Sequence, residues 1–135
     1  MAAPVPIAMI VCDDVYKDMS SGKTALIGLF NNISASKFPA THGRCCVFVT
    51  VTDVRPETEF RLRVVHSETE HVVVEAKGPA PKQTTPLQVC DFCFQLAGMR
   101  FPEPGLYFVE FWGNDKLLFQ RPLRLIDTGK PQTTG

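Results

Sequence analysis

A group of carboxylates near the amino terminus has the residue types that a cation site needs. Asp13, Asp14 and Asp18 follow the first predicted strand closely, and we place them together in the loop after it. Carboxylates from converging loops of a β-sandwich can hold Ca²⁺, which takes roughly six to eight oxygen ligands. In the alternative interpretation they form a solvated acidic turn and accept hydrogen bonds from nearby backbone N–H groups. These three residues are the candidates for a metal site.

The cysteines include a Cys-x-x-Cys pair that resembles a zinc or redox motif. Cys90 and Cys93 fall in a predicted strand, where residues three apart point to opposite faces of the sheet and cannot share one metal ion. The total of five is odd, and the adjacent Cys45-Cys46 does not fit a secreted disulfide framework. We therefore predict reduced thiols and a cytoplasmic location.

Other catalytic or ligand-binding patterns are incomplete. Ser20–Thr24 ends like a phosphate-binding loop, but Lys17 occupies the position of the first glycine, and a strand rather than a helix follows. His42, His66 and His71 form no metal or triad pattern, although the last two flank one hairpin loop. No serine lies in a Gly-x-Ser-x-Gly elbow. The sequence predicts no catalytic residue, no cofactor and no enzyme.

Composition excludes several classes of partner. The chain has 135 residues, 14 Lys+Arg and 14 Asp+Glu, so it lacks the basic excess that favours nucleic acid or an anionic membrane. No apolar run approaches the roughly 20 residues of a membrane span. Met1–Cys12 is apolar but contains no Lys or Arg, and it holds Pro4 and Pro6. We therefore interpret this segment as a strand rather than a secretory signal.

The elements that must position these residues are short strands. Apolar and polar residues alternate, turn signals separate the segments, and no stretch keeps a helical period. The pattern predicts an all-β, two-layer antiparallel β-sandwich of about seven to eight strands. The predicted strands are 5–12, 24–30, 44–53, 59–66, 71–77, 87–96, 105–113 and 117–126. We assign residues 1–129 to one domain and 130–135 to a disordered tail.

Several single residues give more local predictions. Gly28 in the middle of a strand indicates a bulge or the close approach of a facing aromatic ring. Pro122 indicates an edge position or a bulge, because proline cannot donate to a β-ladder. Tyr107 follows Pro104-Gly105, so its hydroxyl is expected to bond nearby backbone, as in the tyrosine corner of other sandwiches. The proline-rich Lys77–Pro86 is interpreted as a crossover between the sheets.

The strand alternation also predicts an exposed apolar surface. If Tyr107, Val109 and Phe111 face the core, the residues between them face outward. A contiguous outward apolar patch is typical of an interface, where aromatic side chains are enriched. The interface candidates are Leu106, Phe108 and Trp112, with Ile10 on the first strand.

Five segments together form a recurring sequence pattern. They are Ile10–Val15 with its Cys-Asp-Asp-Val, Gly22–Phe30, Phe38-Pro39, the Phe-Pro-Glu-Pro-Gly-Leu-Tyr of 101–107, and Arg121–Leu125. The pattern is similar to that of a family of small bacterial proteins of unknown function with an immunoglobulin-like β-sandwich. The resemblance covers nearly the whole chain. It implies that fold and a bacterial origin, and it carries no catalytic residues.

Three classes of function remain open. The first is a non-catalytic protein-interaction module that binds a protein partner or forms a homo-oligomer. The second is a β-sandwich that binds a small ligand, a glycan or calcium, which converging aspartates beside aromatic rings would favour. The third is an enzyme, which would need a concave polar pocket that the sequence does not indicate. We take the first as our prediction and the second as its alternative.

Overall fold

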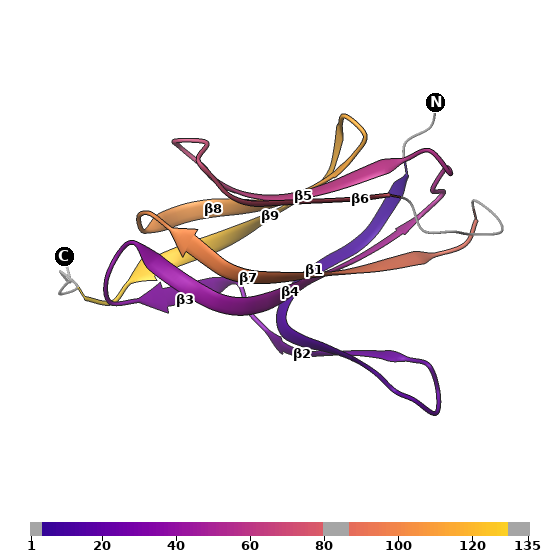
Figure 1. Ribbon diagram of the computed structural model, residues 1–135, viewed down its shortest axis with the longest axis horizontal. Coiled ribbons are helices and arrows are strands. Elements are labelled where there is room, and N and C mark those ends of the chain that lie inside the picture. Colours follow the sequence, from indigo (N-terminus) through magenta and orange to yellow (C-terminus); the bar gives the residue numbers. More distant parts are fainter. Residues whose placement is uncertain (1–3, 80–86, 130–135) are drawn as a thin grey trace.

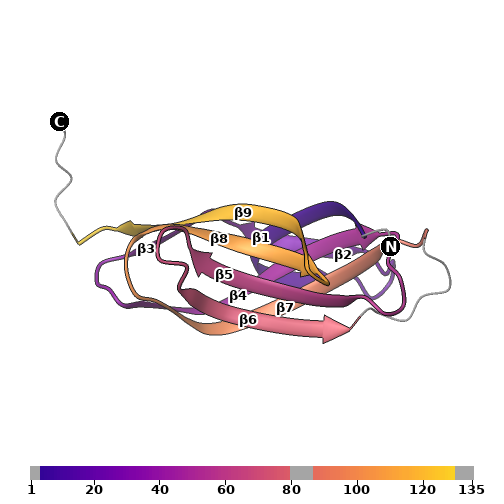
Figure 2. The ribbon, with the colours of Figure 1, turned by 90° about the horizontal axis from the view of Figure 1, so that it is seen from above.

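The computed structural model describes residues 4–79 and 87–129 of the chain. Within these residues nine strands form two facing sheets and no helix is present (Figure 1). Seen from above, the strands of both layers follow the long axis of the molecule (Figure 2). The strands are β1 (Val5–Lys17), β2 (Thr24–Leu29), β3 (Asn32–Ala35), β4 (Ala40–Thr52), β5 (Glu59–His66), β6 (Val72–Pro79), β7 (Cys90–Phe101), β8 (Gly105–Gly113) and β9 (Lys116–Asp127).

The two sheets differ in size and shape. Sheet A has the order β2-β1-β4-β7, and sheet B, a curled half-barrel, has the order β3-β9-β8-β5-β6. The predicted all-β class is confirmed. The wholly antiparallel arrangement is wrong, because β3 is a ninth strand and pairs with β9 in parallel. Its sequence, Asn-Ile-Ser-Ala, is too short to show an alternation, and a parallel pair has no hairpin turn between its strands to mark it.

Strand boundaries also correct the prediction near the amino terminus. We expected Asp13 and Asp14 in a loop, but β1 continues to Lys17 because Cys12–Lys17 pairs with β2. Ladder hydrogen bonds therefore hold polar residues in a strand that the apolar pattern alone would end. The following polar segment is a hairpin loop as predicted, and Gly22 has a φ of +73° in it.

Pro122 lies at an edge of sheet B, as predicted. It is opposite Phe108 of β8, whereas β3 pairs with β9 only from Arg124 onward. At Pro122 the other side of β9 therefore has no ladder partner among the described strands. The proline removes no hydrogen bond from the sheet there.

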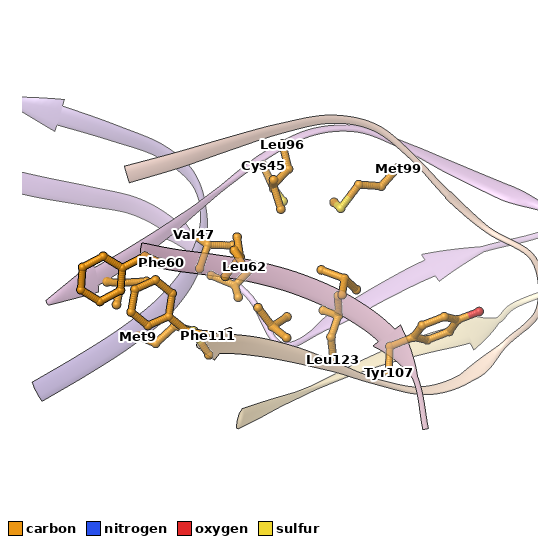
Figure 3. Packing of buried hydrophobic residues seen from close by; sticks show 14 of the residues in the cluster. Met9, Cys45, Val47, Phe60, Leu62, Leu96, Met99, Tyr107, Phe111 and Leu123 are labelled. Carbon is orange, nitrogen blue, oxygen red and sulfur yellow. The ribbon is translucent and has the colours of Figure 1, made fainter. Parts of the chain in front are cut away.

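The core lies between the sheets, and the predicted alternation is confirmed on three strands (Figure 3). Aromatic side chains join the layers: Phe60 and Phe111 come from sheet B, while Phe92 and Phe94 come from sheet A. The inward-facing buried residues of these strands are Cys45, Val47, Val49 and Val51 on β4, Phe60, Leu62 and Val64 on β5, and Tyr107, Val109 and Phe111 on β8.

The turn between β7 and β8 is fixed by the predicted tyrosine corner. The Tyr107 hydroxyl donates to the backbone oxygen of Glu103 at 2.7 Å, and the Glu103 N–H approaches the same hydroxyl at 3.4 Å. Gly105 has a φ of +128°, a conformation that favours glycine. This confirms the role given to Pro104-Gly105 and Tyr107. The predicted tail, residues 130–135, and most of the predicted crossover lie outside the described residues.

Candidate functional site

The outer face of sheet B carries three rows of side chains that cross the strands, and we call this surface the sheet B face. Strand register aligns the rows, because each outward residue lies opposite an outward residue of the next strand. The cation–aromatic row is Leu117, Trp112, Arg61 and Lys77; the charged row is Gln120, Glu110, Arg63 and Glu75; the apolar row is Pro122, Phe108, Val65 and Val72.

The first two rows are tied together around one carboxylate. Glu110 is only 9% exposed although it lies on an outer face, because neighbouring side chains cover it. Its Oε1 is 3.4 Å from Nε of Arg63 and accepts a hydrogen bond from Nε1 of Trp112 at 3.2 Å. The Arg61 guanidinium carbon lies 5.2 Å from the centre of the Trp112 ring, within the range of a cation–π interaction. The aromatic side chain is therefore held between a cation and an anion.

A groove of about 490 Å³ crosses the same face beside the apolar row. Val65 and Phe108 of the apolar row line it, together with Arg63 and Gln120 of the charged row. The β5–β6 hairpin loop contributes Ser67 and Glu70 to its lining. Val65 is only 6% exposed, so the apolar floor is recessed below a polar rim. This combination of an apolar centre and a polar rim is typical of a protein interface.

The structure brings together three of the four predicted interface residues. Leu106, Phe108 and Trp112 all lie on β8 and alternate with the buried core residues of that strand. Ile10 lies on β1, opposite Phe48 of β4, and therefore belongs to sheet A. One predicted patch thus becomes two surfaces on different layers of the molecule.

Sequence reasoning missed the charged members of the sheet B face. Strand alternation predicts only that Arg61, Arg63 and Glu110 face outward from strands whose other side is apolar. Their association depends on the pairing of β5 with β8, which places Arg61 opposite Trp112 and Arg63 opposite Glu110. An alternating strand pattern gives the face of each residue but not its cross-strand partner.

The three candidate metal residues do not converge. Asp14 forms an ion pair with Arg44 across sheet A, and the Asp18 carboxylate accepts hydrogen bonds from Ser20 and Ser21 in the hairpin loop. These hydrogen bonds lower the pKa of Asp18. Asp13 lies over Gly28, so the group that approaches this glycine is a carboxylate and not the predicted aromatic ring. Among the described residues no three His, Cys, Asp or Glu side chains gather into a metal site.

The cysteines separate by strand face, and no two of the five form a disulfide. Cys45 and Cys90 are buried on the inner side of sheet A, whereas Cys12, Cys46 and Cys93 lie on its outer side. The predicted opposite orientation of Cys90 and Cys93 is therefore confirmed. Burial, and then the neighbouring Cys46, raises the pKa of Cys93 to about 11.

Cys93 is expected to be the one thiol that reacts in the native protein, because it alone is exposed. Its raised pKa leaves little thiolate at neutral pH, so the rate with Ellman's reagent should rise about tenfold per pH unit until the pH approaches 11. Absorbance kinetics of the wild type and of Cys93→Ser measure this. A rate that levels off near pH 8, or a second thiol that reacts without unfolding, would contradict the prediction.

The described residues thus define an all-β protein of two facing sheets with one charged and aromatic outer surface. The chain belongs to the DUF6941 family, a family of unknown function, and the match covers residues 7–126. This span begins within β1 and ends within β9, so it includes both sheets. A comparison with curated proteins gives no match. None of the described residues forms a helix long and apolar enough to cross a membrane.

Proposed function

We propose that this protein is a non-catalytic interaction module and that its partner is a second copy of the same chain, bound through the sheet B face. The observation that carries the proposal is the order of side chains in the three rows. Across β5 and β8 each row pairs groups that attract one another, namely Arg63 with Glu110, Arg61 with Trp112 and Val65 with Phe108, so this part of the face is complementary to itself. A two-fold symmetric interface requires such a surface, because both subunits contribute the same patch.

The symmetry can be stated in terms of the strands. A two-fold axis along the strand direction, between β5 and β8, would lay β8 of one copy over β5 of the other. Arg63 would then face Glu110 of the second copy, and Arg61 would face its Trp112. The apolar row would lie on the apolar row of the second copy. Arg63 and Glu110 would form charge pairs between the two copies, and the apolar centre would be removed from water.

We infer further that the two sheets form an immunoglobulin-like sandwich. The sheet order β9-β8-β5-β6, opposite β4-β7, supports this, since it corresponds to strands G, F, C and C′ opposite B and E. The Tyr107 hydroxyl bond at the β7–β8 turn supports it as well, because the tyrosine corner of such domains lies at the start of strand F. In this scheme the sheet B face is the face of strands G, F, C and C′.

We also propose a bacterial origin and a cytoplasmic location. The origin rests on the similarity of the Cys12–Val15 and Pro104–Tyr107 segments to a bacterial family. The location is supported by the five cysteines, none of which forms a disulfide, since thiols persist in a reducing compartment.

Sedimentation velocity of the full chain over a range of concentrations tests the self-association. We expect a dimer for the wild type and a dissociation constant at least about 30-fold higher for Phe108→Glu, because a charge enters the apolar centre of the interface. Met19→Glu is the matched control: Met19 is 97% exposed in the β1–β2 loop, and its replacement should leave the dimer unchanged.

Circular dichroism must show that Phe108→Glu keeps the fold. Trp112, the only tryptophan of the chain, gives a second readout, since its fluorescence should change with concentration in step with dimerisation. A wild type that stays monomeric at high concentration would overturn the proposal. A dimer that survives Phe108→Glu but is lost in Ile10→Glu would overturn it too, because the contact would then lie on sheet A.

A further inference from the structure

The free edge of β2 differs from the other edges of the two sheets. The strand orders leave β2 and β7 at the edges of sheet A, and β3 and β6 at the edges of sheet B. Natural edge strands are commonly very short or carry charges or proline, which discourage pairing with another chain. β7 carries Asp91 and Arg100, β6 carries Glu75 and Pro79, and β3 has only four residues. β2, with the sequence Thr-Ala-Leu-Ile-Gly-Leu, is the one edge of the described sheets without such protection.

β2 is also accessible from both of its faces. Of its six residues only Leu26 is half-buried, and the other five are exposed. Ile27 and Leu29 are 52% and 59% exposed, although both are large apolar side chains. The hairpin of β1 and β2 extends away from the layer of sheet B (Figure 1). A further strand therefore has room to pair with β2.

The backbone groups of β2 that point away from β1 can be identified. Along an antiparallel strand, successive residues direct their N–H and C=O groups alternately to one side and the other. The Asp18 N–H donates to the carbonyl of Lys23 at 2.8 Å, so Lys23 bonds toward β1. Thr24 and Leu26 must then turn their backbone groups to the opposite side. No described strand lies on that side of β2, so these groups are open to another strand.

We propose that β2 pairs in antiparallel with β2 of a second copy of the chain, with Leu26 opposite its own counterpart at the centre. The strand carries no charge, so no like charges oppose each other along this pair. In this register Thr24 lies opposite Gly28 of the second copy, and the two copies of sheet A become one continuous sheet. The contact does not involve the sheet B face, so one copy can use both surfaces and extend the assembly beyond a dimer.

Charges on β1 support this register. Asp13 and Lys17 lie on the same face of β1, and Lys17 is opposite Thr24. Neither side chain has an ion pair among the described residues. The Asp13 carboxylate lies over Gly28, in the space that a side chain at this position would occupy. Since Thr24 would lie beside Gly28 of the second copy, Lys17 would reach across Thr24 to Asp13 of that copy, and the two-fold axis would produce this ion pair twice.

The β2 contact should be the weaker of the two contacts of the chain. A strand of six residues offers much less surface than the roughly 800 Å² per partner of a standard interface. The two ion pairs are exposed to water, and such pairs contribute little. We therefore expect this pairing at concentrations well above those at which the sheet B face binds.

The test is sedimentation velocity of the full chain with Phe108→Glu, the variant expected to weaken the sheet B contact, up to high concentration. We expect a reversible equilibrium between monomer and dimer. Adding Leu26→Lys should weaken this association about tenfold or more, because two like charges then oppose each other at the centre of the strand pair. Circular dichroism must show that the added lysine leaves the fold intact.

A pair of charge reversals at exposed residues tests the register and serves if Leu26→Lys does not fold. Lys17→Glu should raise the dissociation constant about tenfold, since two attractions become two repulsions. Adding Asp13→Lys should restore it. The two residues lie about 13 Å apart along one extended strand, so a contact within one copy would not give this rescue. Lys37→Glu is the matched control: Lys37 is exposed between β3 and β4, and its reversal should leave the equilibrium unchanged.

Failure of the β2 contact is distinguishable from failure of the sheet B contact. A Phe108→Glu variant that is monomeric at every concentration, pairing that is undiminished by Leu26→Lys, or charge reversals without rescue would each overturn the β2 contact. If the wild type and Phe108→Glu associate equally and Leu26→Lys abolishes both associations, the β2 contact is supported and the sheet B contact is overturned.

Discussion

Replacing Phe111 with alanine is expected to lower the free energy of unfolding by about 3–5 kcal/mol, the usual cost of removing a fully buried phenylalanine. Phe111 is fully buried and lies in the middle of the aromatic cluster that joins the layers. Its ring stacks on Phe60 of the same sheet at 5.2 Å and meets Phe92 and Phe94 of the opposite sheet at 5.9 Å each. Alanine would remove all three contacts and leave a cavity between the sheets.

Chemical denaturation followed by far-ultraviolet circular dichroism measures this loss. Tyr16→Ala is the matched control, since it truncates an aromatic ring that is 54% exposed near the end of β1. We expect that change to cost less than about 0.5 kcal/mol. Equal effects of the two substitutions would mean that Phe111 does not bridge the sheets as described.

The position of Phe111 could be predicted from the sequence because alternation along β8 is regular. One side of that strand is continuously apolar, and a single register slip would expose all of it. The same reasoning placed Leu106, Phe108 and Trp112 on the outer side. Periodicity thus predicts the face of each residue, and so the class of the fold and most of its core.

Contacts between strands distant in the sequence could not be predicted in this way. The charged row needs β5 beside β8, and the parallel pair of β3 with β9 joins segments about 90 residues apart. Asp13 and Asp14 show the limit most clearly. They are adjacent in the sequence, but ladder pairing places the Asp13 carboxylate over Gly28 and the Asp14 carboxylate beside Arg44.

The second large effect is expected at His66, which is 3% exposed and connects three parts of the structure. Its Nδ1 accepts hydrogen bonds from the N–H groups of Glu68 and Thr69, each at 3.1 Å, so this nitrogen carries no proton. The proton is therefore on Nε2, which lies 3.1 Å from Oε1 of Glu103. The ring also meets Tyr107 edge-on at 4.8 Å. One imidazole thus holds the β5–β6 hairpin loop against the tyrosine corner.

His66→Phe should lower the free energy of unfolding by about 3 kcal/mol, because the new ring fills the space but leaves two N–H groups of the loop without an acceptor. Hydrogen exchange should show the Glu68 and Thr69 amides losing protection first. His71→Phe is the matched control, since His71 ends the same loop and its side chain is exposed. If both variants are equally stable and the two amides stay protected, the loop is held by its own backbone bonds, and the imidazole only fills space beside Tyr107.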